Sequence, residues 1–190
     1  MGVPVRSLIF DSVTESQSRP VASETRPPLS RIRPIAPSDP AKEMAYAKRF
    51  IETGNNKAAE KTVLDLLAEN PGYGPALTFL LRLYGDTRRP DDAKALFDKA
   101  RRGGYADKII YSVTIRACGK NGKLVRGTAL LEEAISEGKA SPQAFCSMVE
   151  AYGRLGLPAG AREIFDMARK GGFATTAVFT SMISAYSKAN

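Results

Sequence analysis

The chain repeats itself every 34 residues, and this period constrains its fold more than any other feature. Residues 145–157 read FCSMVEAYGRLGL and residues 179–190 read FTSMISAYSKAN, so an aromatic residue, Ser-Met and Ala-Tyr return at matching positions. The same step aligns a turn position at Gly54, Arg88, Gly122 and Gly156 without an insertion. A fixed period of this length is the signature of an array in which each unit buries its apolar face only against its neighbours. The chain is therefore predicted to fold as stacked units.

Apolar residues within each unit follow the spacing of a helix. Phe145, Met148, Val149 and Tyr152 lie at positions i, i+3, i+4 and i+7, which form one stripe along a helix. The same stripe recurs in other units at Leu77, Leu80, Leu81 and Tyr84 and at Phe179, Met182, Ile183 and Tyr186. We expect all of these side chains to lie in the core.

A second helical stripe follows each turn. It is formed in two of the units by Ala93, Leu96, Phe97 and Ala100 and by Ala161, Ile164, Phe165 and Ala168. A Gly-Gly pair ends both of these stretches, and the small residue that opens each stripe lets the two helices of a unit approach closely. The sequence thus predicts an all-α fold, an α-solenoid of stacked helix-turn-helix repeats that wind into a right-handed superhelix.

The predicted helical-repeat domain covers residues 41–190 and contains about four hairpins plus one terminal helix. That last segment, residues 177–190, keeps the interior pattern of a first helix, which favours a truncated array. Residues 1–40 hold seven of the 12 prolines, with arginine and serine between them and little apolar content. Because such a segment cannot bury enough surface to offset its ordering entropy, we predict a disordered N-terminal tail.

The composition narrows the classes of function. The chain has no histidine, so the usual general base and the commonest metal ligand are both absent. Its two cysteines, Cys118 and Cys146, are too few for a structural zinc site and occupy different columns of the repeat. We therefore expect free thiols, no enzyme activity, no metal and no cofactor. The net charge of +8, most of it in residues 41–190, favours an anionic partner.

The location of the protein is constrained less closely. Free thiols favour a reducing compartment, and no apolar run reaches the about 18 residues that cross a bilayer, so we expect a soluble protein without a membrane partner. The Arg- and Ser-rich tail is typical of leaders that direct proteins to a mitochondrion or plastid, but Asp11, Glu15 and Glu24 argue against that class. A cytoplasmic protein and a secreted bacterial effector stay open as alternatives.

The repeats resemble those of the pentatricopeptide repeat family. Its units read as an aromatic residue, variable or apolar residues, Ile or Val, then Ala-Tyr, a basic residue and Gly. Residues 144–156 (AFCSMVEAYGRLG) and 178–190 (VFTSMISAYSKAN) follow this pattern, and residues 110–122 (IYSVTIRACGKNG) follow it with Cys118 at the Tyr position. The resemblance covers about residues 75–190. The period of 34 and the first unit, with Ala47 and Pro71, are instead typical of the related tetratricopeptide repeat.

This resemblance implies that the first helices line a concave groove for single-stranded RNA, with about one base read per unit by two side chains. The first reading residue follows the aromatic residue, and the second closes the unit. These positions are held by Thr78, Ser112, Cys146 and Thr180 and by Asp107, Ser141 and Thr175, respectively. Thr78 with Asp107 is similar to the guanine-preferring pair of the family, and Ile109 holds the aliphatic position that sandwiches a base.

Basic residues extend along the same predicted groove. At about 100° per residue, a side chain four positions after the first reading residue lies beside it, and this column holds Arg82, Arg116 and Glu150. Another column holds Lys120, Arg154 and Lys188, which predicts a ladder of positive charge for phosphates, interrupted by Asp86. We therefore predict a single-stranded RNA-binding protein that acts in RNA processing, stability or expression. The alternative is a tetratricopeptide-like scaffold that binds a protein partner in the same groove.

Overall fold

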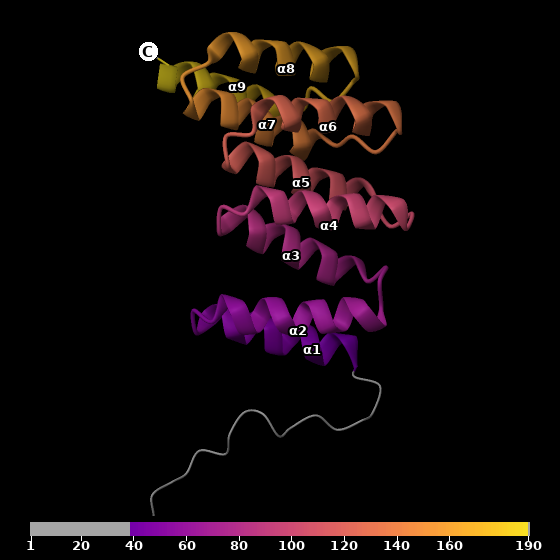
Figure 1. Cartoon of the computed structure of the whole chain (residues 1–190). Helices are drawn as coiled ribbons and strands as arrows, with labels where there is room; N and C mark the ends of the chain where they lie inside the picture. Colours follow the sequence, from indigo (N-terminus) through magenta and orange to yellow (C-terminus); the bar gives the residue numbers. More distant parts are fainter. Residues whose placement is uncertain (1–38, 190) are drawn as a thin grey trace, which may run out of the picture. The chain divides into compact units, whose positions relative to one another are not determined.

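The computed structural model describes residues 39–189 of the chain, and its side chains up to residue 187. The predicted tail falls almost wholly on residues 1–38, which lie outside the described residues. Within the described range the chain forms nine α-helices and no strand (Figure 1). They are α1 (Pro40–Glu52), α2 (Asn56–Glu69), α3 (Gly74–Asp86), α4 (Pro90–Arg102), α5 (Lys108–Lys120), α6 (Leu124–Ser136), α7 (Pro142–Arg154), α8 (Pro158–Lys170) and α9 (Thr176–Ala189). The prediction of an all-α helical-repeat fold is confirmed.

The first helix begins slightly earlier than the sequence predicts. The carboxylate of Asp39 accepts a hydrogen bond from the backbone nitrogen of Ala41 at 3.0 Å, so Asp39 caps α1. Pro40 then occupies the first helical position, where the missing backbone donor costs nothing. Both residues were expected in the tail, and their place at a helix start corrects that expectation.

Each unit is a helical hairpin, and the units are joined mainly through their first helices. Within units, α1 packs on α2, α3 on α4, α5 on α6 and α7 on α8. Between units, α3 packs on α5, α5 on α7 and α7 on α9. Each second helix also packs against the next first helix, as α2 does against α3. The first unit differs because α1 does not pack on α3 in the way that the later first helices pack on one another. The helices α3, α5, α7 and α9 therefore form one continuous layer, and the residues at one column of this layer lie in a row.

The aromatic column of the repeat lies at the centre of the core in the interior units. Tyr111 and Phe145 are fully buried, and Phe97 from a second helix is buried beside them. The rings of Phe97 and Tyr111 pack edge to face with centroids 5.0 Å apart, and those of Phe145 and Phe173 stack at 5.1 Å. Such ring pairs stabilise a core beyond the area they bury. The predicted core stripe is confirmed for these units.

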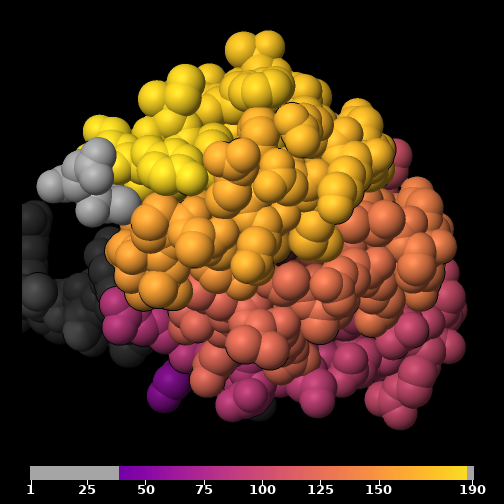
Figure 2. Space-filling view, turned by 90° about the horizontal axis from the view of Figure 1, so that it is seen from above, coloured from indigo at the N-terminus to yellow at the C-terminus, as the bar shows by residue number. Residues whose placement is uncertain are grey.

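The last helix departs from this expectation. Phe179, Ile183 and Tyr186, which were predicted in the core, are 48%, 71% and 40% exposed. In the other units the second helix of the hairpin covers the same columns, and no second helix follows α9 among residues 39–189. The side chains of α9 that face α7 are buried as predicted, Met182 and Ala185 among them. The uncovered side of α9 lies open on the surface in the view of Figure 2.

One turn position is strained. Gly54, Gly122 and Gly156 take positive φ angles of 75°, 69° and 67° between the two helices of their units, and Arg88 takes φ 57° at the same column. A residue with a Cβ atom loses roughly 1–2 kcal/mol in this left-handed region, whereas glycine does not. The chain therefore carries a local cost at Arg88.

Replacing Arg88 by glycine is expected to raise the free energy of unfolding by about 1 kcal/mol, because relief of the strain exceeds the added entropy of the unfolded chain. Chemical denaturation followed by circular dichroism measures this change. Thr87→Gly is the matched control: Thr87 has an ordinary φ of −89°, and its hydroxyl donates to the Leu83 carbonyl at 2.7 Å, so the protein should lose stability. A loss on Arg88→Gly would contradict the assignment of strain.

Candidate nucleic-acid interface

The structure brings one predicted pair of reading residues into direct contact. Ser112 lies in the first turn and a half of α5, and Ser141 caps the start of α7, one unit further along the chain. Their Oγ atoms lie 2.6 Å apart, within hydrogen-bonding distance. Because Ser112 donates its one hydroxyl proton to the Lys108 carbonyl at 2.7 Å, the hydroxyl of Ser141 donates to Ser112. The two hydroxyls thus form one polar point between neighbouring units.

The closing residues share a structural role at the starts of the first helices. Asp107 caps α5, where its Oδ1 atom accepts a hydrogen bond from the backbone nitrogen of Ile110 at 2.8 Å. Ser141 caps α7 in the same way through the nitrogen of Ala144, and Thr175 directly precedes α9. Capping fixes the side chains of Asp107 and Ser141 against the helices that follow them. In these two units the second reading position is therefore held rigidly at a helix start.

The first reading positions differ in exposure. Thr78 on α3 is half-buried, and Thr180 on α9 is exposed. Cys146 on α7 is 5% exposed, and burial raises the pKa of its thiol above the ordinary value. With Ser112, the structure thus presents hydroxyl groups in three units and a buried, protonated thiol in the fourth. The aliphatic residue Ile109 is 59% exposed beside Ser112 on α5, where a flat ring would find an apolar contact.

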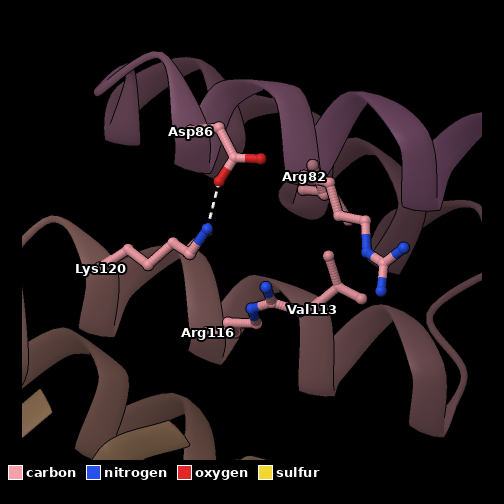
Figure 3. Close-up of a pocket in the computed structure, with 7 residues that line it drawn as sticks. Arg82, Asp86, Val113, Arg116 and Lys120 are labelled. Carbon is pink, nitrogen blue, oxygen red and sulfur yellow. Dashed lines mark hydrogen bonds and ion pairs between the residues drawn. The ribbon is translucent and has the colours of Figure 1, made fainter. Parts of the chain in front are cut away.

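The basic column is tied to the preceding unit in two places. The Nζ atom of Lys120 forms an ion pair with Asp86, which occupies the same column one unit earlier (Figure 3). Arg154 donates from Nη2 to the carbonyl of Gly119 at 2.9 Å. The side chain of Lys188 lies outside the described residues. Asp86 therefore does more than interrupt the column, because it also neutralises Lys120.

The column of Arg82 and Arg116 lines a depression that the sequence analysis did not foresee. It has a volume of about 210 Å³, lies between α3 and α5, and is bordered by Leu81, Arg82, Asp86, Val113, Arg116, Ala117 and Lys120 (Figure 3). The next residue of the column, Glu150 on α7, accepts a hydrogen bond from Ser181 of α9 at 3.3 Å. The signal in the sequence is the pair of arginines 34 residues apart, since one repeat step places them on neighbouring helices.

Metal chemistry finds no support in the described residues. No group of three or more His, Cys, Asp or Glu side chains in residues 39–187 could hold a metal ion. Cys118 and Cys146 are free and buried, which confirms the predicted free thiols. Burial raises the pKa of the Cys118 thiol as well, so both sulfurs are poor ligands and poor nucleophiles near neutral pH.

Comparison with known proteins decides the family. The model of the PPR repeat family matches residues 76–105, 109–138 and 144–173, which are the units built on α3, α5 and α7. The chain belongs to the pentatricopeptide repeat family. No curated protein matches the sequence.

A solved structure shares the fold of this pentatricopeptide repeat chain. The crystal structure of the pentatricopeptide repeat protein PPR10 from maize superposes with a TM-score of 0.65 at 16% sequence identity. The match covers 80% of this chain and 22% of the maize chain, so the present sequence spans about a fifth of that protein's length. In the part of the chain that the structure describes, no helix is both long and apolar enough to span a bilayer.

Proposed function

We propose that this pentatricopeptide repeat protein binds single-stranded RNA along the layer formed by α3, α5, α7 and α9. Repeats of this family read about one base per unit through two or three side chains. The observation that carries the proposal is the contact between Ser112 and Ser141, whose Oγ atoms lie 2.6 Å apart. Ser112 is the first reading residue of its unit, and Ser141 is the residue that closes the same unit, so the contact brings the two predicted readers together. A base placed there would meet both hydroxyls together.

The units are expected to differ in how well they read a base. The Ser112 and Ser141 pair combines two hydroxyls with the exposed side chain of Ile109, on which a base can stack. Thr78 with Asp107 offers a hydroxyl and a carboxylate, which fit the donors on the edge of guanine. Cys146 is buried and contributes little beside Thr175. Since stacking is worth on the order of 1–3 kcal/mol per base, two or three effective readers give modest affinity that depends on salt.

The basic column supplies the first test. Replacing both Lys120 and Arg154 by glutamine is expected to weaken binding to a pool of short single-stranded RNAs on the order of tenfold at low salt. The change removes the charge of Arg154, which releases counterions when it neutralises a phosphate, and leaves the carboxylate of Asp86 without the cation that pairs with it. Fluorescence anisotropy at several salt concentrations measures the affinity. Wild-type protein should also lose affinity steeply as salt rises.

The control removes two charges from the second helices, where no RNA contact is proposed. Lys94→Gln with Lys170→Gln changes exposed residues on α4 and α8 and should leave the affinity within about twofold of wild type. Thermal melts show whether the loss of the Arg154 bond to Gly119 alters the fold. Absence of RNA binding at low salt, or equal affinity in the Lys120 and Arg154 variant, would favour a scaffold that binds a protein.

A further inference from the structure

The depression between α3 and α5 is a charged feature of the described surface. The guanidinium groups of Arg82 and Arg116 border it from two neighbouring units (Figure 3). Neither arginine forms an ion pair or a side-chain hydrogen bond with any residue of the described range. Both are exposed. Two like charges on one small hollow repel each other, so an anion between them would stabilise the arrangement.

The third cation of the hollow is already paired. Lys120 contacts the carboxylate of Asp86 at one end of the depression, so these two charges cancel. The unpaired charge is then concentrated on Arg82 and Arg116. Leu81, Val113 and Ala117 form the apolar part of the wall, which weakens screening by water and strengthens the attraction for an anion.

A pair of arginines on two packed first helices occurs once in this column within the described array. The column holds Lys48 on α1 before the two arginines, and Glu150 on α7 and Ser184 on α9 after them. Because α1 does not pack on α3 as α3 packs on α5, Lys48 and Arg82 do not form a second such pair. A carboxylate or a hydroxyl at this column cannot repeat the double positive charge between the later units. A ligand recognised by the two arginines would therefore be held at a single place, between the second and third units, and not along the whole layer.

We propose that this hollow, the Arg82–Arg116 pocket, binds a single phosphate group between the two guanidinium forks. Guanidinium groups bind phosphate through two parallel hydrogen bonds, which a lysine cannot do. A water molecule takes about 30 Å³ in the liquid, so a hollow of about 210 Å³ holds a phosphate group with several waters. Where the phosphate belongs to an RNA backbone, the inference rests on the proposed function. A free phosphate ion presents the same chemistry.

The first experiment uses inorganic phosphate as the probe and needs no RNA. Side-chain Nε–Hε resonances of Arg82 and Arg116 in the full chain are expected to shift with phosphate and to reach saturation. Chloride at the same ionic strength should produce no saturable shift. In the R82Q/R116Q variant the remaining arginine resonances should not respond, whereas the K94Q/K170Q variant, which also lacks two positive charges, should respond like wild type.

The second experiment asks whether RNA supplies the phosphate. Affinity for a pool of single-stranded RNAs decreases as salt rises, so the slope of log affinity against log salt is negative. In R82Q/R116Q this slope should become shallower by about 0.7, the amount expected when one phosphate contact is lost. Loss of two separate phosphate contacts would make it shallower by about 1.4, which would contradict a single shared phosphate. The K94Q/K170Q variant should keep the wild-type slope.

The two experiments separate this inference from the proposed function. A phosphate shift in a chain that binds no RNA supports the pocket with free phosphate as its ligand, and removes the RNA proposal. A change of slope without a response to free phosphate supports the pocket with the RNA backbone as its ligand. RNA binding with an unchanged slope in R82Q/R116Q, together with no saturable phosphate shift, would overturn the pocket and leave the proposed function standing.

Discussion

Replacing Tyr111 by alanine is expected to lower the free energy of unfolding by about 3–5 kcal/mol. The side chain is fully buried, and its ring packs edge to face on Phe97 with centroids 5.0 Å apart. Its hydroxyl donates to Oε1 of Glu133 on α6 at 2.6 Å. The substitution therefore removes the contact between α5 and α4, leaves a cavity, and takes away the hydrogen bond that ties α5 to its own second helix.

The size of this effect follows from the place of α5 in the array. It packs on α3 in one direction and on α7 in the other, and a repeat array is held together only by contacts between neighbours. Loss of core volume in α5 therefore weakens the units on both sides. Urea denaturation followed by circular dichroism measures the change, and a second transition would show that the two halves have become uncoupled.

Phe179→Ala is the matched control, because Phe179 occupies the same column of the repeat on α9. It is 48% exposed and keeps one ring contact, to Phe165 at 5.0 Å. Its removal should cost roughly 1–3 kcal/mol, the sum of one aromatic pair and about half of the burial of a Phe side chain. Equal losses at Tyr111 and Phe179 would show that position in the period, and not burial, sets the stability.

The period of 34 residues was enough to predict the fold, since it repeats both the helical stripes and the turns. Each predicted first and second helix is present in the described range. The stripe on α9 could not be placed correctly from the period alone. Burial of Ile183 requires a second helix that covers it, and the sequence of α9 itself does not show whether such a helix follows. A repeated column thus predicts where a side chain points, and its burial depends on what packs there.

Contacts between units were harder to predict than the units themselves. The pairing of Asp86 with Lys120 could have been foreseen, because opposite charges one repeat apart at one column face each other on stacked helices. The burial of Cys146 could not, because it depends on how closely α9 approaches α7. The column alone shows Cys146 beside the core stripe, and the neighbouring unit then covers it.

That close approach has a cause in the sequence. Gly85, Gly119 and Gly153 share one column of the first helices, and each faces an alanine one unit further along the chain: Ala117, Ala151 and Ala185, respectively. A Cβ atom added at these glycines would lie 3.0, 3.0 and 2.6 Å from the nearest atom of its alanine. Real Cβ atoms are almost never found below 3.0 Å. The first helices therefore stack as closely as they do because this column has no side chain.

Replacing Gly153 by alanine is expected to lower the free energy of unfolding by about 1–3 kcal/mol, because α7 and α9 must move apart. The sign is informative, since alanine inside a helix is ordinarily more stable than glycine by about 1 kcal/mol. Gly74→Ala is the matched control: Gly74 opens α3, and apart from its chain neighbours no atom lies within 4 Å of an added Cβ, so the protein should lose much less stability than with Gly153→Ala. Urea denaturation of both variants measures the difference.

The glycine column also links stability to the proposed RNA site. The spacing of the first helices sets the distance between successive reading residues. Successive units can read successive bases only where that distance suits the RNA backbone. Gly153→Ala should therefore weaken RNA binding at temperatures where the protein is still folded, with the reading residues unchanged. If the Gly153→Ala variant were as stable as the Gly74→Ala variant, α7 and α9 would not be held in close contact by this glycine. The spacing of the first helices would then need another cause.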